Sequence, residues 1–84
     1  MATGVVVGWN KRTGFIAIKC QDGDFTVAEV LDGWEPNVAD SCVSGALTSL
    51  GHEELTVVGE GETVEVFIQD CHCSAGSARK LLQQ

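Results

Sequence analysis

Residues 8–18, GWNKRTGFIAI, predict a β-hairpin. The segments on either side, GVVVGW at 4–9 and GFIAIKC at 14–20, are rich in the β-branched and apolar residues that favour strands. Asn10 begins the short polar connection between them and Gly14 follows it, and both residue types suit a tight turn. We therefore expect the two segments to pair as antiparallel strands.

The second strand of this hairpin presents two different faces, because successive side chains on a strand point to opposite sides. One face is apolar and the other is mixed: Ile16, Ile18 and Cys20 alternate with Phe15, Ala17 and Lys19. Since Phe15 shares its face with a lysine, we expect its ring to be exposed.

Length and composition indicate one small domain over residues 1–84. The chain has 84 residues, of which 44% are hydrophobic and one is proline, and these values favour a folded domain over a disordered tail. No apolar run reaches the about 18 residues of a membrane-spanning helix, and the N-terminal residues lack the features of a signal peptide. We expect a cytoplasmic or nuclear protein whose four cysteines are reduced.

The rest of the chain contains further strand candidates. Residues 25–31, FTVAEVL, predict a third strand with a helix as the alternative, and residues 63–69, TVEVFIQ, alternate as another strand. The stretch 38–58 is compatible with a short strand, a helical turn or both. The tail 74–84 fits a closing strand or a short helix with Ser77 near its N-cap. About five short strands between glycine turns predict an all-β protein, a small barrel.

The charges are segregated along the chain, whose net charge is -7. Residues 1–20 hold three basic side chains and no acid, residues 21–70 hold all 12 acids and no lysine or arginine, and residues 71–84 hold two basic side chains. The net charge repels a polyanion at long range, but the two basic segments can form a local patch if the fold brings them together.

The opening of the chain resembles the cold-shock domain, a five-stranded OB-type barrel that binds single-stranded RNA and DNA. The family pattern Gly-x-Val-Lys-Trp-Phe-Asn, followed by Lys-Gly-Phe-Gly-Phe-Ile, is similar to GVVVGWN and TGFIAI here. The positions that fit the pattern are Gly4, Val6, Trp9, Asn10, Gly14, Phe15 and Ile18. Later segments, ALTSLGHEEL and GEGETVEVFI, also look like parts of the family, and SAGSARKL lies where the family has its closing strand. The resemblance implies an OB-like barrel with a loop insertion around 32–45, which contains Trp34.

Several rings of the family's base-stacking platform are missing from this sequence. The family's Trp-Phe pair corresponds to Gly8 and Trp9, and the second phenylalanine of its second strand corresponds to Ala17. The aromatic and histidine positions of the third strand are also altered, whether DSCVSGAL or DFTVAEVL forms that strand. Because one stacked base contributes about 1–3 kcal/mol, the resemblance implies a degenerate member with much reduced affinity.

Two rings and five cations are the predicted nucleic-acid contacts. Trp9 and Phe15 would stack on bases. The cations would hold phosphates, and they are Lys11, Arg12, Lys19, Arg79 and Lys80. The structural alternative makes Trp9 a partly buried barrel residue and Phe15 a cross-strand packing partner, with the cations scattered over the surface.

Two functions are compatible with these observations. The first is weak, low-specificity binding of single-stranded RNA or DNA through the first hairpin. The alternative is a degenerate barrel without that activity, which docks a basic protein partner on its acidic side or mimics nucleic acid. No cofactor is predicted, and we do not expect an enzyme, because no pattern fixes acid pairs such as Glu53 and Glu54 in a pocket.

The motif Cys71-His72-Cys73 is the one sequence feature that suggests a metal, with Cys20, Cys42 and His52 as additional ligands. On a strand, the two thiols of Cys-x-Cys share a face and the histidine points away from them. The spacing also differs from the Cys-x-x-Cys knuckle of structural zinc sites. We therefore expect reduced thiols here and no metal site.

Overall fold

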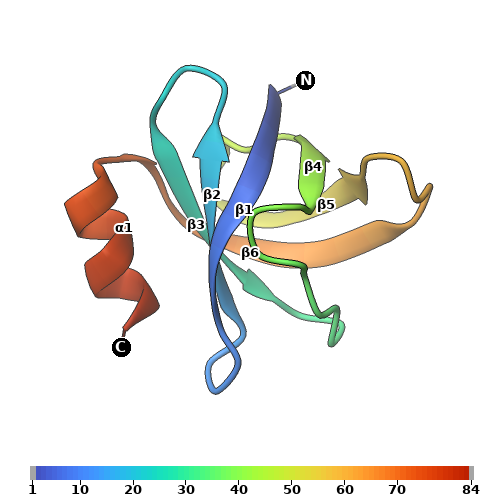
Figure 1. The fold of residues 1–84 in the computed structure, drawn as a ribbon, viewed down its shortest axis with the longest axis horizontal. Coiled ribbons are helices and arrows are strands. Elements are labelled where there is room, and N and C mark those ends of the chain that lie inside the picture. Colours follow the sequence, from blue (N-terminus) through green and yellow to red (C-terminus); the bar gives the residue numbers. More distant parts are fainter. Residues whose placement is uncertain (1, 84) are drawn as a thin grey trace.

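The structure, a computed structural model, describes residues 2–83, so the two terminal residues of the predicted domain lie outside it. The described chain forms a closed antiparallel barrel and one helix (Figure 1). The strands are β1 (Ala2–Asn10), β2 (Phe15–Cys20), β3 (Phe25–Val30), β4 (Cys42–Gly45), β5 (Gly51–Val57) and β6 (Thr63–Cys73). The predicted barrel is confirmed, with six described strands rather than about five. Around the barrel their order is β1-β2-β3-β6-β5-β4.

The predicted hairpin of β1 and β2 is confirmed. The two strands pair in antiparallel register, and a bulge between Val6 and Gly8 shifts the pairing by one residue. The Gly14 amide donates a hydrogen bond of 2.8 Å to the Asn10 carbonyl across the turn. Gly14 has a φ of 81°, a conformation that glycine adopts without the strain a side chain would bring.

The stretch 38–58, left open by its sequence, forms the two strands β4 and β5. β4 pairs with β1 on one side and with β5 on the other, which closes the barrel. Residues 31–41 lie between β3 and β4, and the last four residues of the stretch 32–45, where a loop insertion was expected, form β4. For residues 25–31, the helix alternative is wrong, because Phe25–Val30 forms β3.

Apolar side chains from all six strands and Leu47 from the loop between β4 and β5 fill the barrel interior. The fully buried ones include Val6, Ile16, Ile18, Val27, Ala28, Val43, Leu47, Leu55, Val66 and Ile68, although Val27 belongs to a second, outer cluster. Burial of one such valine, leucine or isoleucine side chain contributes about 1.5–3 kcal/mol. The alternation on β6, with Val64, Val66 and Ile68 inside, follows the predicted pattern.

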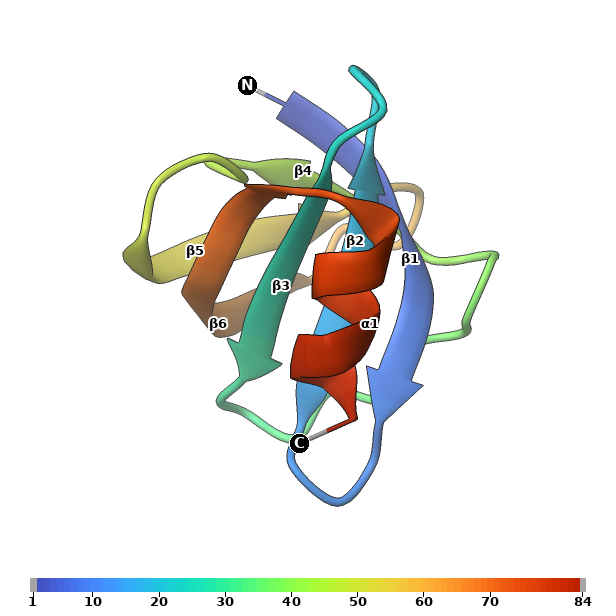
Figure 2. The same cartoon turned by 90° about the vertical axis from the view of Figure 1, so that its left-hand side faces the viewer.

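The C-terminal segment forms helix α1 (Ala75–Leu82) and not a closing strand. Ser74 is its N-cap, and the Ser74 hydroxyl accepts a hydrogen bond of 3.2 Å from the Ser77 amide. Ser77, expected near the N-cap, lies three residues after it, and its amide is the group that the cap satisfies. Figure 2 shows α1 lying across the outer side of β1, β2 and β3.

Candidate nucleic-acid interface

The outer face of β1, β2 and β3, on which the cold-shock resemblance would place the stacked bases, is covered by α1. Phe15 and Phe25 are half-buried there and pack with Val27, Ala78 and Leu81 in the second apolar cluster. The expectation that Phe15 is exposed was wrong, because the apolar stripe of the helix needs an apolar surface to pack on. Phe15 behaves as the packing partner of the structural alternative.

Two small residues make room for the helix. Gly8 on β1 and Ala17 on β2 are direct partners across the hairpin. A Cβ atom added to Gly8 would lie 2.6 Å from Leu82 Cδ2 and 3.6 Å from Ala17 Cβ. These are the positions where the sequence lacks two rings of the cold-shock pattern. The helix thus occupies the space that aromatic side chains would need.

The two basic segments of the chain meet at one end of the barrel. The Asn10 side-chain amide donates a hydrogen bond of 2.6 Å to the Leu82 carbonyl, which joins the end of β1 to the last turn of α1. Lys11 and Arg12 follow Asn10 in the turn, and Arg79 and Lys80 lie in that last helical turn; all four are exposed. We call these four residues the basic end. Figure 2 shows the helix terminus beside the β1–β2 turn.

Lys19 does not belong to the basic end. It pairs with Val5 and Phe25 near the other end of β2, four residues beyond Phe15. Four residues of a strand span roughly 13 Å. Of the five cations predicted to hold phosphates, the fold therefore gathers four.

Trp9 lies at the basic end and lines a cavity of about 250 Å³ with a second tryptophan, Trp34. Both rings are half-buried and pack against the main core. Lys11 Nζ lies 5.3 Å from the centroid of the Trp9 ring, within cation–π range. The cavity is also lined by Gly14, Val30, Gly33 and Glu35. We call it the Trp pocket.

Trp34 was not among the predicted site residues, although its local sequence held a signal. In Asp32-Gly33-Trp34, the aspartate side chain accepts a hydrogen bond of 3.2 Å from the Trp34 amide, as in an Asx turn. The other carboxylate oxygen of Asp32 accepts one of 3.1 Å from the Glu65 amide on β6. This pair of bonds holds the loop against the barrel and directs Trp34 toward Trp9.

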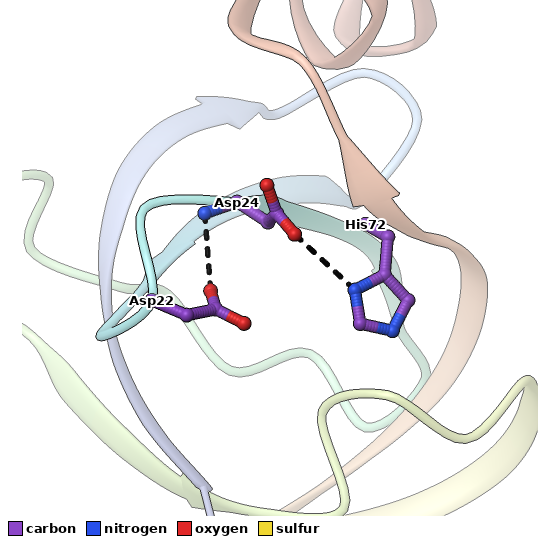
Figure 3. A group of neighbouring side chains, drawn as sticks. All are labelled: Asp22, Asp24 and His72. Atoms are coloured by element: carbon purple, nitrogen blue, oxygen red, sulfur yellow. Dashed lines mark hydrogen bonds and ion pairs between the residues drawn. The ribbon is translucent and has the colours of Figure 1, made fainter.

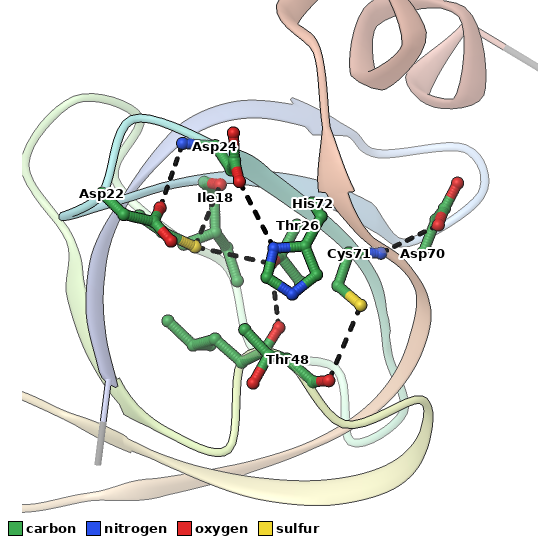
Figure 4. Close-up of polar contacts among 10 residues, drawn as sticks. Ile18, Asp22, Asp24, Thr26, Thr48, Asp70, Cys71 and His72 are labelled. Atoms are coloured by element: carbon green, nitrogen blue, oxygen red, sulfur yellow. Dashed lines mark hydrogen bonds and ion pairs between the residues drawn. The ribbon is translucent and has the colours of Figure 1, made fainter.

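Cys71, His72 and Cys73 point to three different surroundings. Cys71 Sγ lies 3.6 Å from the Thr48 carbonyl (Figure 4), while His72 turns toward Asp24. Cys73 packs under α1. Burial and the nearby Asp70 carboxylate raise the pKa of the Cys73 thiol to about 11. Burial also raises the pKa of Cys20, which packs in the barrel beside Thr26.

Asp22, Asp24 and His72 form the group of potential metal ligands that the described residues bring together (Figure 3). One ligand atom of each lies within 4.8 Å of the others, and all three are exposed. Asp22 accepts a hydrogen bond of 3.1 Å from the Asp24 amide, and His72 Nδ1 lies 3.3 Å from Asp24 Oδ2. The turn between β2 and β3 and this one cross-strand contact account for the arrangement.

Comparison with known proteins finds no match to this chain among protein-family models, curated proteins or solved structures. Within residues 2–83, no helix has the length and apolar character needed to cross a membrane. The likeness to the cold-shock domain therefore rests on the short motifs quoted above. A barrel by itself is compatible with many functions.

Proposed function

We propose that this chain is a degenerate cold-shock-like protein that binds single-stranded nucleic acid weakly and with low sequence specificity. The observation that carries the proposal is the basic end, where the fold joins four of the five cations of an acidic chain beside the Trp pocket. Cationic grooves next to aromatic rings are the usual way to bind single strands without reading their sequence.

The Trp pocket and the basic end have different roles in this binding. A base enters the Trp pocket and stacks on the accessible parts of Trp9 or Trp34, and Lys11 leaves the Trp9 ring to contact a phosphate. Arg12, Arg79 and Lys80 extend the phosphate track. Glu35 at the rim of the pocket repels phosphate. The sugar-phosphate backbone of the bound nucleic acid therefore lies on the side of the pocket nearer to α1.

Two features keep the affinity low. The covered outer face of β2 removes Phe15 from stacking, so one or two bases stack here at about 1–3 kcal/mol each. The net charge of -7 also repels the strand before contact. Both features favour a low-affinity binder whose contacts are mainly to the backbone.

Tryptophan fluorescence tests the proposal. Short oligo(dT) and oligo(U) strands are titrated at low and at physiological salt, and we expect saturable quenching that weakens with salt. Removing two phosphate contacts with the double variant Lys11→Ala/Arg12→Ala lowers the slope of log affinity against log salt by about 1.4, at about 0.7 per contact.

Lys19→Ala is the matched control, because it removes a cation of the same hairpin away from the basic end. It should leave both the affinity and the salt slope within error of the parent. The absence of quenching even at low salt contradicts the proposal. So does a Lys19→Ala variant that loses as much affinity as the double variant at Lys11 and Arg12.

A further inference from the structure

A second outer face, formed by β3, β6 and β5, carries an exposed aromatic ring. Phe67 on β6 is 43% exposed. It is paired with His52 on β5 on one side and with Glu29 on β3 on the other. The ring therefore offers an apolar surface whose direct cross-strand neighbours are both polar.

The next row of the same face holds two glutamates side by side. Glu54 on β5 and Glu65 on β6 are direct cross-strand partners, and both side chains are exposed. Directly opposed residues on one face have Cβ atoms about 4.5–5.5 Å apart. Like charges at that distance destabilise a sheet. The pairing of Glu54 with Glu65 therefore lowers the stability of the folded protein.

The three strands of this face, β3, β5 and β6, contain no lysine or arginine that could offset this charge. We call the group of Glu29, His52, Glu54, Glu65 and Phe67 the Phe67 face. Figure 1 shows the β5–β6 hairpin extending to the side of the barrel away from α1. None of these five residues belongs to the basic end or lines the Trp pocket, although Glu29 on β3 is the cross-strand partner of Phe15.

We propose that the Phe67 face docks an arginine-rich segment of a partner protein. A guanidinium placed between Glu54 and Glu65 turns their repulsion into two charge-assisted hydrogen bonds, the geometry for which arginine is suited. A second guanidinium stacks on the Phe67 ring, with Glu29 beside it. The proposal concerns a different surface from the proposed nucleic-acid site and does not depend on it.

Fluorescence anisotropy with a defined probe tests this docking. The probe is a labelled peptide of alternating arginine and glycine, and its counterpart of alternating glutamate and glycine controls for non-specific binding. The double variant Glu54→Gln/Glu65→Gln should weaken binding of the arginine peptide by about tenfold or more, the range expected when close interface charges are removed. Phe67→Ala should weaken it by a further measurable factor.

Glu60→Gln/Glu62→Gln is the matched control. It removes the same charge from the turn between β5 and β6, and both residues are exposed. We expect it to change the affinity less than about twofold, as is usual for charges outside a contact. Equal losses in the two double variants would mean that the peptide senses only net charge, and would overturn the proposal. An arginine peptide that fails to bind the parent at low salt would overturn it as well.

Thermal unfolding supplies a second readout on the same variants. Relief of the repulsion between Glu54 and Glu65 should raise the melting temperature of Glu54→Gln while its peptide affinity falls. If the two glutamates had only a structural role, Glu54→Gln would lower the melting temperature or leave it unchanged, and the affinity for the arginine peptide would stay the same. Sedimentation of the protein alone tests a second copy as the occupant: self-association that Arg79→Glu abolishes would overturn the assignment to a partner protein.

Discussion

The two outer faces of this barrel both carry aromatic rings, but only one of them is covered. On β1, β2 and β3 the rings of Phe15 and Phe25 lie under α1, and the small residues Gly8 and Ala17 admit the helix. On β3, β6 and β5 the ring of Phe67 faces solvent between Glu29 and His52. The difference lies in helix α1, which packs on the first face and leaves the ring on the second exposed.

The largest expected change in stability comes from a substitution that disrupts the packing of α1 on the covered face. Ala78 on α1 is 2% exposed, and Ala78→Asp buries a charge with no partner, so we expect a loss of at least about 3 kcal/mol in the free energy of unfolding. Ala75→Asp is the control, because Ala75 is exposed in the first helical turn, where a negative charge is favourable. Urea denaturation followed by Trp fluorescence measures both. Equal losses would show that the helix does not pack as described.

A pH effect on stability follows from the raised pKa of Cys73, the thiol under the helix. The pKa of Cys73 is about 11, against an ordinary value of 9.0, so its protonated form is favoured by folding. Its contribution to stability is complete below about pH 9 and is lost as the pH rises toward 11, by about 2 kcal/mol for a shift of this size. Cys73→Ala should flatten the stability curve between these pH values. An unchanged slope would contradict the assignment of that loss to Cys73.

The contact between Gly8 and Leu82 is testable by a double-mutant cycle. Gly8→Ala places a methyl group against the leucine, and we expect a loss of about 1–2 kcal/mol, typical of an overpacked site. Leu82→Ala by itself also lowers stability, but in its background Gly8→Ala should be nearly neutral. A fully additive double variant would show that the two residues do not touch.

The smallest expected change in stability concerns the uncovered face, and it is an increase rather than a loss. Glu54→Gln should raise the free energy of unfolding by about 0.2–1 kcal/mol, because it removes a like-charge cross-strand pair. Glu60→Gln, in the turn, should leave it unchanged. Denaturant midpoints at low salt resolve the difference, which should shrink as salt is added. A destabilised Glu54→Gln variant would mean that the glutamate makes a favourable contact on this face.

The fold could be predicted from sequence wherever side chains alternate. Residues 8–18 and 63–69 have clear turn residues and β-branched alternation, and both form the strands expected. β4 was harder to predict because Cys42–Gly45 is short and made of small residues, and its pairing with β1 is fixed by contacts distant in sequence. The sequence placed Ser77 near the N-cap of a helix but did not single out Ser74 as the cap, because both serines fit the local pattern.

The candidate site could be predicted only in part. The segregation of cations into the two end segments predicted the basic end, since charge alone marked those residues. The burial of Phe15 could not be read from β2, because it depends on a helix 60 residues further on. Trp34 was overlooked because its role comes from the Asp32 carboxylate, which ties its loop to β6.

The hydrogen bond between Asn10 and Leu82 joins residues that are 72 positions apart. A ribosome adds about 5–20 residues per second, so the 67 positions from Phe15 to Leu82 take between about 3 and 13 seconds to make. During that interval Phe15 and Phe25 have no helix to cover them. Newly made chains therefore expose an aromatic surface that the finished molecule hides, and this is the period in which they are most open to capture by chaperones or to aggregation.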